Sequence, residues 1–187
     1  MKSLYLKNYN YAPYEVDAEN VNKGIVKLFG GADDVALGSL TIKYCDTIPD
    51  NFTDKVSGAL ESFTVENLNT TIVGEMAFKD CTKLHTFSVN TKITEVKESA
   101  FENTAITSFD AKELRTLAKN AFSGCSSLAS FNLGENTALT TIPEGALKGT
   151  GSMNLVIPAT ITTIESGAFE DSKVKTVTFA TDSEITY

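Results

Sequence analysis

The sequence has few of the side chains from which most catalytic and metal sites are built. Its 187 residues include one histidine, three cysteines and no tryptophan. A single histidine excludes a multi-histidine metal centre, and any acid–base chemistry would have to come from carboxylates or lysines. These shortages point away from an enzyme.

A long apolar run and an excess of positive charge are also missing. No stretch approaches the roughly 18 apolar residues of a membrane-spanning helix, and residues 1–9 lack the apolar run of a signal peptide. The 16 Lys and Arg are outnumbered by 24 Asp and Glu, which gives a net charge of −8. We therefore expect no transmembrane segment and no nucleic-acid partner, because an acidic chain repels phosphate backbones.

Serine and threonine are abundant, with 15 and 24 copies, and 42% of the residues are apolar. That apolar share is typical of a folded protein. The length suffices for one domain with a sizeable core.

A short segment with alternating apolar residues recurs seven times. Two copies are Leu84-His85-Thr86-Phe87-Ser88-Val89 and Leu128-Ala129-Ser130-Phe131-Asn132-Leu133. The fourth position of the segment falls at residues 40, 63, 87, 109, 131, 155 and 177, in steps of 22 to 24 residues. This period lies in the range of leucine-rich repeats, and the alternation predicts one β-strand per repeat.

The rest of each repeat carries two apolar positions three apart, followed by a pair such as Ala100-Phe101. An acid such as Glu98 often precedes the pair, which predicts a single helical turn with its acid near the positive end. Stacked repeats would place the strands side by side, about 4.8 Å apart, with the Phe column behind them. The sequence therefore predicts an α/β-type repeat solenoid, with a parallel sheet on one face and single-turn helices on the other.

Two stretches resemble the BspA-like leucine-rich-repeat family of surface proteins. They are residues 155–169, LVIPATITTIESGAF, and residues 121–128, AFSGCSSL. The resemblance covers about residues 36–187, with Leu147 in place of Phe and with Thr104 and Ser172 where the family often has Cys. It implies a right-handed solenoid whose parallel sheet lines the concave face. It also implies export to the cell surface, adhesion or binding of host macromolecules, and no catalytic residue.

Residues 1–35 do not match the repeat pattern, and we interpret them as an N-terminal cap on a solenoid formed by residues 36–187. The solenoid would contain six to seven repeats of 22–24 residues, the last incomplete. The spacing of the apolar residues predicts a cap helix between Asp17 and Gly30-Gly31. Four tyrosines near its start form either a contact patch or a shield over the end of the core; they are Tyr5, Tyr9, Tyr11 and Tyr14.

The cysteines and the histidine do not form a recognisable site. Cys81 and Cys125 occupy the same position two repeats apart, about 10 Å, which exceeds the reach of a disulfide. Cys45 lies outside their column, and no pair has the spacing of a zinc site. We expect buried thiols, no metal and no cofactor. His85 is expected on the surface, at the turn that enters a strand.

Phenylalanine and glutamate also recur at fixed positions. The acidic residues Glu75, Glu98 and Glu144 suggest either calcium or a solvated flank, and the flank is favoured because the oxygen spacing of a calcium loop is missing. Lys119 interrupts that series. Nine phenylalanines are expected in the core: Phe63, Phe78, Phe87, Phe101, Phe109, Phe122, Phe131, Phe169 and Phe179.

The candidate binding surface is the outward side of the strands. Alternation places two polar columns there, and hydroxyl residues dominate them. The columns are either a binding face or a neutral solution to stacking side chains about 4.8 Å apart. The predicted binding residues are Ser62, Thr64, Thr86, Ser88, Ser108, Asp110, Ser130, Asn132, Thr176 and Thr178.

These patterns predict a non-enzymatic binding or adhesion module that contacts a protein or glycan through the concave sheet. From the family resemblance we expect a cell-surface or secreted protein. The alternative is a structural spacer or stalk segment of a larger surface protein.

Overall fold

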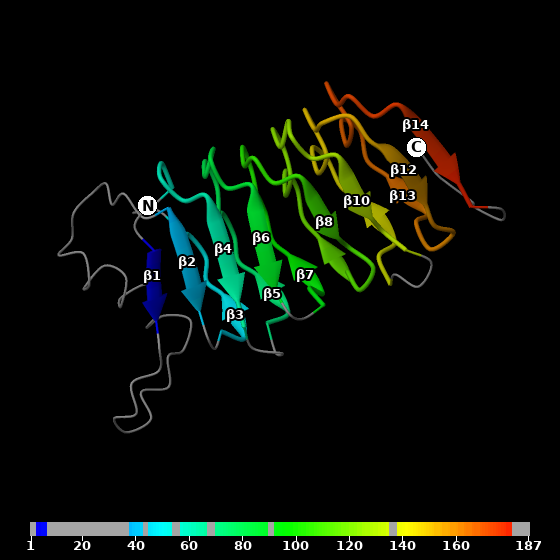
Figure 1. Ribbon diagram of the computed structural model, residues 1–187. Coiled ribbons are helices and arrows are strands. Elements are labelled where there is room, and N and C mark those ends of the chain that lie inside the picture. The colour runs from blue at the N-terminus through cyan, green and yellow to red at the C-terminus, as the bar shows by residue number, and fades with distance from the viewer. Residues whose placement is uncertain are drawn as a thin grey trace.

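The computed structural model describes residues 3–6, 38–42, 45–53, 57–66, 70–89, 92–134 and 138–180. Over these ranges the regular elements are short β-strands joined by turns, and every strand pair is parallel (Figure 1). Successive repeats lie next to one another in chain order, so the predicted parallel-sheet solenoid is confirmed.

One row of the solenoid consists of longer strands, and from β2 onward these coincide with the recurring segment found in the sequence. Their register aligns equivalent positions, for example Phe63 with Phe87 and Ser108 with Ser130. The strands are β1 (Ser3–Leu6), β2 (Ser39–Ile42), β4 (Ser62–Val65), β6 (Thr86–Val89), β8 (Ser108–Asp110), β10 (Ser130–Asn132), β12 (Asn154–Ile157) and β14 (Thr176–Phe179).

A second row consists of two-residue strands that the sequence analysis did not identify as strands. Each contains the second apolar position of its repeat, such as Val96 or Leu117, and each lies behind the row of longer strands (Figure 1). The strands are β3 (Thr47–Ile48), β5 (Ile72–Val73), β7 (Glu95–Val96), β9 (Thr116–Leu117), β11 (Thr141–Ile142) and β13 (Thr163–Ile164).

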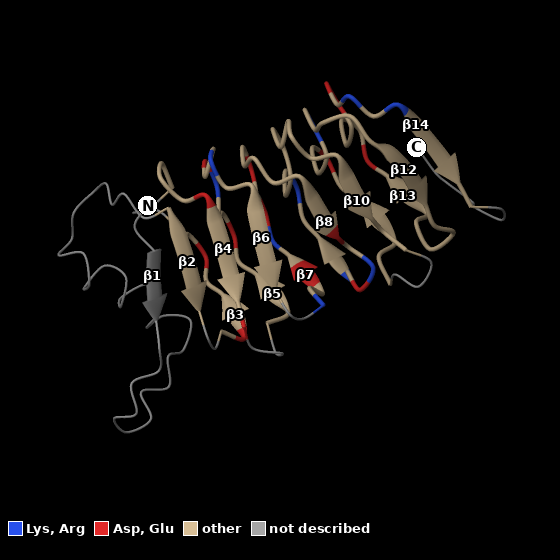
Figure 2. Cartoon of the chain, in the orientation of Figure 1, with Lys and Arg blue, Asp and Glu red and all other residues tan. Residues whose placement is uncertain are grey.

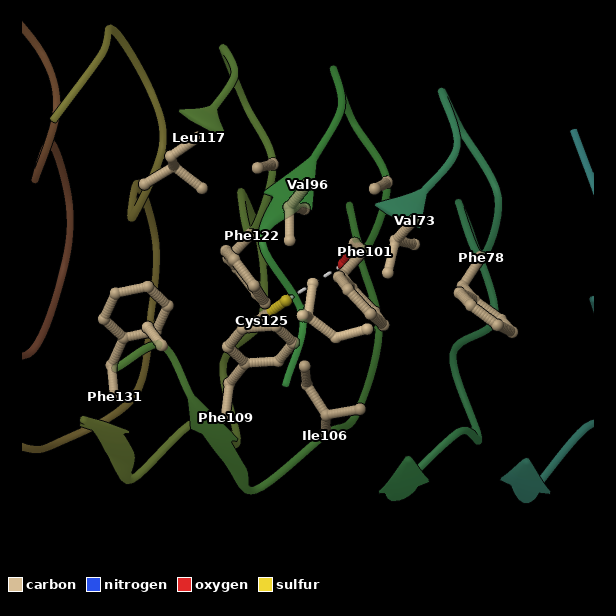
Figure 3. Close-up of a cluster of buried hydrophobic side chains, with 14 of the residues drawn as sticks. Val73, Phe78, Val96, Phe101, Ile106, Phe109, Leu117, Phe122, Cys125 and Phe131 are labelled. Atoms are coloured by element: carbon tan, nitrogen blue, oxygen red, sulfur yellow. Dashed lines mark hydrogen bonds between the residues drawn. The ribbon is translucent and has the colours of Figure 1, made fainter. Parts of the chain in front are cut away.

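The core between the two rows is built on stacked phenylalanine rings. In the strand column, Phe87 stacks on Phe63 and on Phe109 with ring centroids 5.9 and 6.2 Å apart. In the turn column, Phe101 stacks on Phe78 and Phe122 at 5.4 and 5.1 Å. The two columns meet edge to face, and the small apolar residues of the short strands close the other side (Figure 3). Aromatic contacts of these geometries add to the stabilisation from burial.

The predicted helical turns are wrong, because the described residues contain no helix. The residue before each Ala-Phe pair and the third residue after the Ala have left-handed φ, as in Met76 (52°) and Asp80 (59°). Two left-handed residues four apart interrupt any α-helix. Alternate amides donate instead to the next repeat, such as Phe78 N to Ala100 O at 2.8 Å.

Of the predicted N-terminal cap, residues 1–35, the structure describes only residues 3–6. β1 joins the sheet with Ser3 opposite Ser39 and Leu6 opposite Ile42, so it extends the row of longer strands by one. The predicted cap helix and the tyrosines Tyr9, Tyr11 and Tyr14 lie outside the described residues. The boundary at residue 35 remains a prediction.

The last strand departs from the predicted core. Val177 and Phe179 belong to the inward column, yet they are 41% and 48% exposed. Phe169 is half-buried, whereas Phe52, which the sequence analysis left out of the core, is buried and contacts Phe63 and Phe78. The prediction of a buried Phe179 is wrong, because no described strand pairs with the far side of β14.

The row of longer strands is interrupted at two places, where β8 does not pair with β6 and β12 does not pair with β10. Phe87 of the strand column comes nine positions after Phe78 of the turn column, whereas Phe109 comes only eight positions after Phe101. The same change from nine to eight occurs between the repeats of Phe131 and Leu155. Each break therefore lies where a short connection follows a long one.

The longer connections contain an additional turn. Leu84 N donates to Cys81 O, and Leu128 N donates to Cys125 O, both at 2.9 Å. The rings stay stacked across the break between β6 and β8. The reverse change, from eight positions before β8 to nine before β10, leaves those two strands paired.

The candidate functional site

The candidate site is the outward face of the longer strands, which we call the long-strand face. Its two columns are formed by the first and third residues of the strands, and the register of each pair brings equivalent residues together. Ser62 and Thr64 are half-buried. The other eight predicted residues are exposed: Thr86, Ser88, Ser108, Asp110, Ser130, Asn132, Thr176 and Thr178.

Charge is concentrated around the long-strand face and not on it. Figure 2 shows the longer strands almost free of charged residues, while Lys, Arg, Asp and Glu gather on the connecting turns. Asp110, at the end of β8, is the one charged residue in the two columns of the described strands. A partner would therefore meet a mostly neutral, hydroxyl-rich surface with a single carboxylate near its middle.

Asp110 and Asn132 also have a structural role that the sequence analysis did not foresee. Asp110 Oδ1 accepts a hydrogen bond from Lys112 N, and Asn132 Oδ1 accepts one from Gly134 N, both at 3.2 Å. These bonds to the backbone two residues on are typical of Asx turns. The two residues therefore end their strands, and only Asp110 adds a charge.

Some of the hydroxyl groups are satisfied within the columns. The hydroxyl oxygens of Ser39 and Ser62 lie 2.6 Å apart, and Thr176 Oγ1 donates to Asn154 Oδ1 at 2.9 Å. Such contacts support the structural explanation of the polar columns at their two ends. Between β6 and β10 no bond between column side chains is recorded in the described residues.

A cleft of about 490 Å³ opens on the long-strand face at the break between β6 and β8. Its apolar lining comes from Phe87, Val89, Ile93 and Phe109. The side chains of Phe87 and Val89 are half-buried, and those of Ile93 and Phe109 are buried. The polar lining comes from both strands and from the turns beyond them: Ser88, Ser108, Asp110, Lys92, Lys112 and Glu113.

Ion pairs flank this cleft on its turn side. Lys92 Nζ lies 2.6 Å from Glu113 Oε1 and joins the turns of two successive repeats. Hydrogen bonding to Glu113 raises the pKa of Lys92, and the same bond lowers the pKa of Glu113. Lys112 Nζ lies 3.8 Å from Asp110 Oδ2, which is a looser pair.

Sequence reasoning found Ser88, Ser108 and Asp110 but missed the cleft and its residues Lys92 and Glu113. The available signal was the change from nine to eight positions between the turn and strand residues, which coincides with both breaks in the row of longer strands. The side chains that line the gap could not be assigned without the fold, because they come from two repeats and two turns.

The remaining candidate residues show no arrangement for chemistry. His85 is exposed just before β6, as predicted, and its Nδ1 lies 3.0 Å from Lys83 O. Cys45, Cys81 and Cys125 are buried, as predicted, and burial raises the pKa of each thiol. In the part of the chain that the structure describes, no group of three His, Cys, Asp or Glu residues could hold a metal ion.

The column of Glu75, Glu98 and Glu144 lies exposed on the turn side of the solenoid. Lys119, which interrupts the column, pairs with Glu144 at 2.7 Å, and their hydrogen bond raises the pKa of Lys119 and lowers that of Glu144. This contact between neighbouring repeats is typical of a solvated, mixed-charge flank.

In a comparison with protein families, the chain matches the BspA type leucine rich repeat region, with six copies over residues 46–181. No curated protein and no solved structure matches the chain. Among the described residues there is no helix with the length and apolarity to cross a membrane. The six matched copies cover the larger part of the chain and coincide with the strand-and-turn units of the fold, so this protein belongs to the BspA-type leucine-rich-repeat family.

Proposed function

We propose that this chain is a non-enzymatic binding module that contacts a macromolecular partner through the long-strand face. The observation that carries the proposal is the exposed, nearly uncharged double column from β6 to β14, interrupted by one cleft. Repeat proteins of this type use extended sheet surfaces of this kind to bind other proteins. The family is generally non-enzymatic, which agrees with the scarcity of catalytic residue types.

We further propose that the module belongs to a cell-surface or secreted protein and serves in adhesion. Membership of the BspA-type family supports this proposal, because proteins with these repeats are often exported. The partner would be a protein or a glycan of a host or of its surrounding matrix.

The proposal is tested by binding of the chain to an array of matrix proteins and glycans. Two double variants place lysines on the long-strand face, Ser88→Lys with Ser108→Lys and Ser130→Lys with Thr176→Lys. The control is Ser123→Lys on the turn side, where neighbouring repeats already carry Lys79 and Lys148. We expect at least a tenfold loss of binding with one or both double variants and no loss with the control. Binding that survives both double variants would contradict the proposal.

A structural spacer is the second candidate, and contacts between the repeats favour it. Lys79 pairs with Glu102 at 3.0 Å and Lys148 with Glu170 at 2.6 Å, each across one repeat boundary. Together with the stacked rings, these pairs connect the repeats along the stack. A spacer would bind nothing on the array, so the same experiment separates the two functions.

A further inference from the structure

We propose that the cleft between β6 and β8 binds one aliphatic side chain of an extended polypeptide. A lysine or arginine next to that side chain would pair with Asp110. This inference rests on the proposed function, because it assumes that the long-strand face meets a partner. Beyond the proposed function, the inference names the part of the long-strand face that selects the partner. It also names the side chains that the partner must present there.

The apolar part of the cleft suits a side chain and not a flat ring. Phe109 is stacked between Phe87 and Phe131, at 6.2 and 6.0 Å, so the faces of these rings are covered by one another. The apolar wall of the cleft therefore consists of the edges of the rings and the aliphatic side chains of Val89 and Ile93. Sugars are usually held against an open aromatic face, which this cleft lacks, whereas an aliphatic side chain needs only apolar walls.

The broken ladder adds backbone polar groups to the walls of the cleft. Ser130 N donates to Thr107 O, and Ala111 N donates to Asn132 O, so the backbone groups directly before and after β8 point toward β10. In a parallel ladder successive residues alternate sides, which directs the backbone groups of Ser108 and Asp110 toward β6. Because β6 and β8 are not paired, these groups face the gap and can bond to the backbone of an extended ligand.

The charges around the cleft favour a basic neighbour for the inserted side chain. Lys92 is engaged by Glu113 at 2.6 Å, whereas the Asp110 carboxylate is 67% exposed and lies 3.8 Å from the nearest ammonium, that of Lys112. Asp110 stands alone as a charge on the long-strand face. A cation of the partner would therefore find its complement here and at no other column position of the described strands.

The test is selection from a displayed library of random linear peptides on the immobilised full chain. Ser108→Lys places a long cation at the mouth of the cleft, and Ser130→Lys makes the same change at its register partner on β10. Asp110→Asn removes the charge and keeps an oxygen for the Asx turn, as Asn132 does one repeat later. Asn132→Asp is the reciprocal control. Thermal melts establish that each variant is folded.

We expect enriched peptides to contain Leu, Ile, Val or Met next to Lys or Arg. The dissociation constant of such a peptide should rise at least tenfold with Ser108→Lys. It should rise about two- to fivefold with Asp110→Asn, the range of an exposed ion pair, and the salt dependence of binding should become weaker. Ser130→Lys and Asn132→Asp should each change it by less than about twofold, because neither residue lines the cleft.

Three outcomes would overturn the inference. If the enriched peptides bind the Ser108→Lys variant as tightly as the original chain, the cleft takes no part in recognition. A library without any enriched peptide would exclude the polypeptide occupant, and so would glycan binding that Ser108→Lys abolishes. If Ser130→Lys alone weakens a partner, the cleft inference fails while the proposed function stands. If neither lysine has an effect, the cleft inference fails, and the two double variants on the long-strand face then decide the proposed function.

Discussion

The buried position three residues after the turn phenylalanine alternates between thiol and hydroxyl side chains. Cys81 contacts Thr53 Oγ1 at 3.0 Å, and Cys125 contacts Thr104 Oγ1 at 3.3 Å and donates to Phe101 O at 3.0 Å. Thr150 Oγ1 donates to Leu147 O at 2.9 Å. The position selects a small side chain that can hydrogen-bond to the turn. This explains why Thr104 replaces the Cys common in the family without harm to the core.

The thiols should affect stability at alkaline pH. Burial raises the pKa of Cys81 from its ordinary value of 9.0 to about 12 and the pKa of Cys45 and Cys125 to about 11. Above pH 9 an unfolded thiol ionises while a folded one stays neutral, so the free energy of unfolding should fall as pH rises toward 11. Below pH 9 the thiols should add no pH dependence to the free energy of unfolding.

Denaturant melts between pH 8 and 10.5 measure this fall in stability. The control carries Cys81→Thr and Cys125→Thr, residues that the same position already tolerates in Thr104 and Thr150. The free energy of unfolding of this control should fall less steeply with rising pH than that of the original chain. Equal slopes would contradict the raised pKa values of these two thiols. The native thiols should also react slowly with a thiol reagent at pH 8, because burial denies access.

Loss of a ring from the middle of the stack should be costly. Phe122 is fully buried and contacts Phe101, Phe109 and Phe131. Phe122→Ala should lower the free energy of unfolding by about 3–5 kcal/mol. Phe179→Ala is the matched control at an exposed site and should cost clearly less. A thermal melt that ranks the two variants in the opposite order would contradict the assignment of the ring columns.

At the scale of the element, the turns explain why the helix prediction failed. Six successive turns have left-handed residues immediately before the Ala or its equivalent: Asn51, Met76, Ser99, Asn120, Gly145 and Gly167. Met and Ser have no local preference for this conformation, so their identity offers no signal for it. Hydrogen bonds to the next repeat stabilise it, as in Met76 N to Glu98 O at 2.9 Å. A single repeat taken alone lacks those partners.

Two glycines should separate backbone strain from backbone crowding. Gly149 has a φ of 64°, and a new Cβ there would make ordinary van der Waals contacts with the Gly124 backbone at 3.6 Å. At Gly74 a Cβ would lie 2.5 Å from the backbone atoms Asp50 N and Pro49 C. Gly149→Ala should lower the free energy of unfolding by about 1–2 kcal/mol, because a residue with a Cβ is strained in the left-handed conformation. Gly74→Ala should cost more, about 3 kcal/mol, because the preceding repeat would have to move.

Chemical denaturation of the two alanine variants measures this difference. Equal costs would show that the repeats separate easily at Gly74, contrary to the close stacking of the short-strand row.

The step from a nine- to an eight-residue connection should decide whether β8 pairs with β6. Insertion of one Lys between Ala105 and Ile106 would give the β8 repeat the nine-residue connection of the β6 repeat. We expect β8 then to pair with β6, with slower hydrogen exchange at the amides of Ser108 and Asp110. The same insertion between Lys173 and Val174 is the control, since β12 and β14 already pair. Unchanged exchange at Ser108 and Asp110 would disprove this explanation of the breaks.

At the scale of the whole molecule, stability should decrease toward the last described strand. The ring stack runs from Phe52 to Phe131 and continues with Leu147 and Leu155 in the equivalent positions. In β14 all four residues are exposed, and β12 is its one strand partner in the described chain. Since repeats of a solenoid are stabilised by their neighbours, a strand with one neighbour has the least support.

Hydrogen exchange followed by mass spectrometry should show this gradient. Amides of β14 should exchange fastest among the described long strands from β4 onward, apart from the unpaired amides of Ser108 and Asp110 in β8. Those of β4 should be among the slowest. Protection of β14 equal to that of β4 would contradict the gradient and would show that this strand is covered in solution.

The candidate site was predictable from the sequence to the extent that it follows the repeat. Alternation placed Thr86, Ser88, Ser108 and the other column residues on one outward face, because the side-chain period of a strand is fixed. The cleft was not predictable, because it depends on how two repeats of unequal connection fit together. Asp110 and Asn132 were among the predicted binding residues, but their role in ending the strands required the positions of the Lys112 and Gly134 amides.

The sequence was sufficient to establish the period, the family and the parallel strands, because these depend on apolar residues that recur at a constant spacing. It was also sufficient to place the thiols and most of the phenylalanines inside. The form of the turns, the breaks after β6 and β10, and the cleft between Phe87 and Phe109 arise only between repeats. Hydrogen bonds and ring contacts that join residues more than twenty positions apart decide those features, and a local pattern carries no information about them.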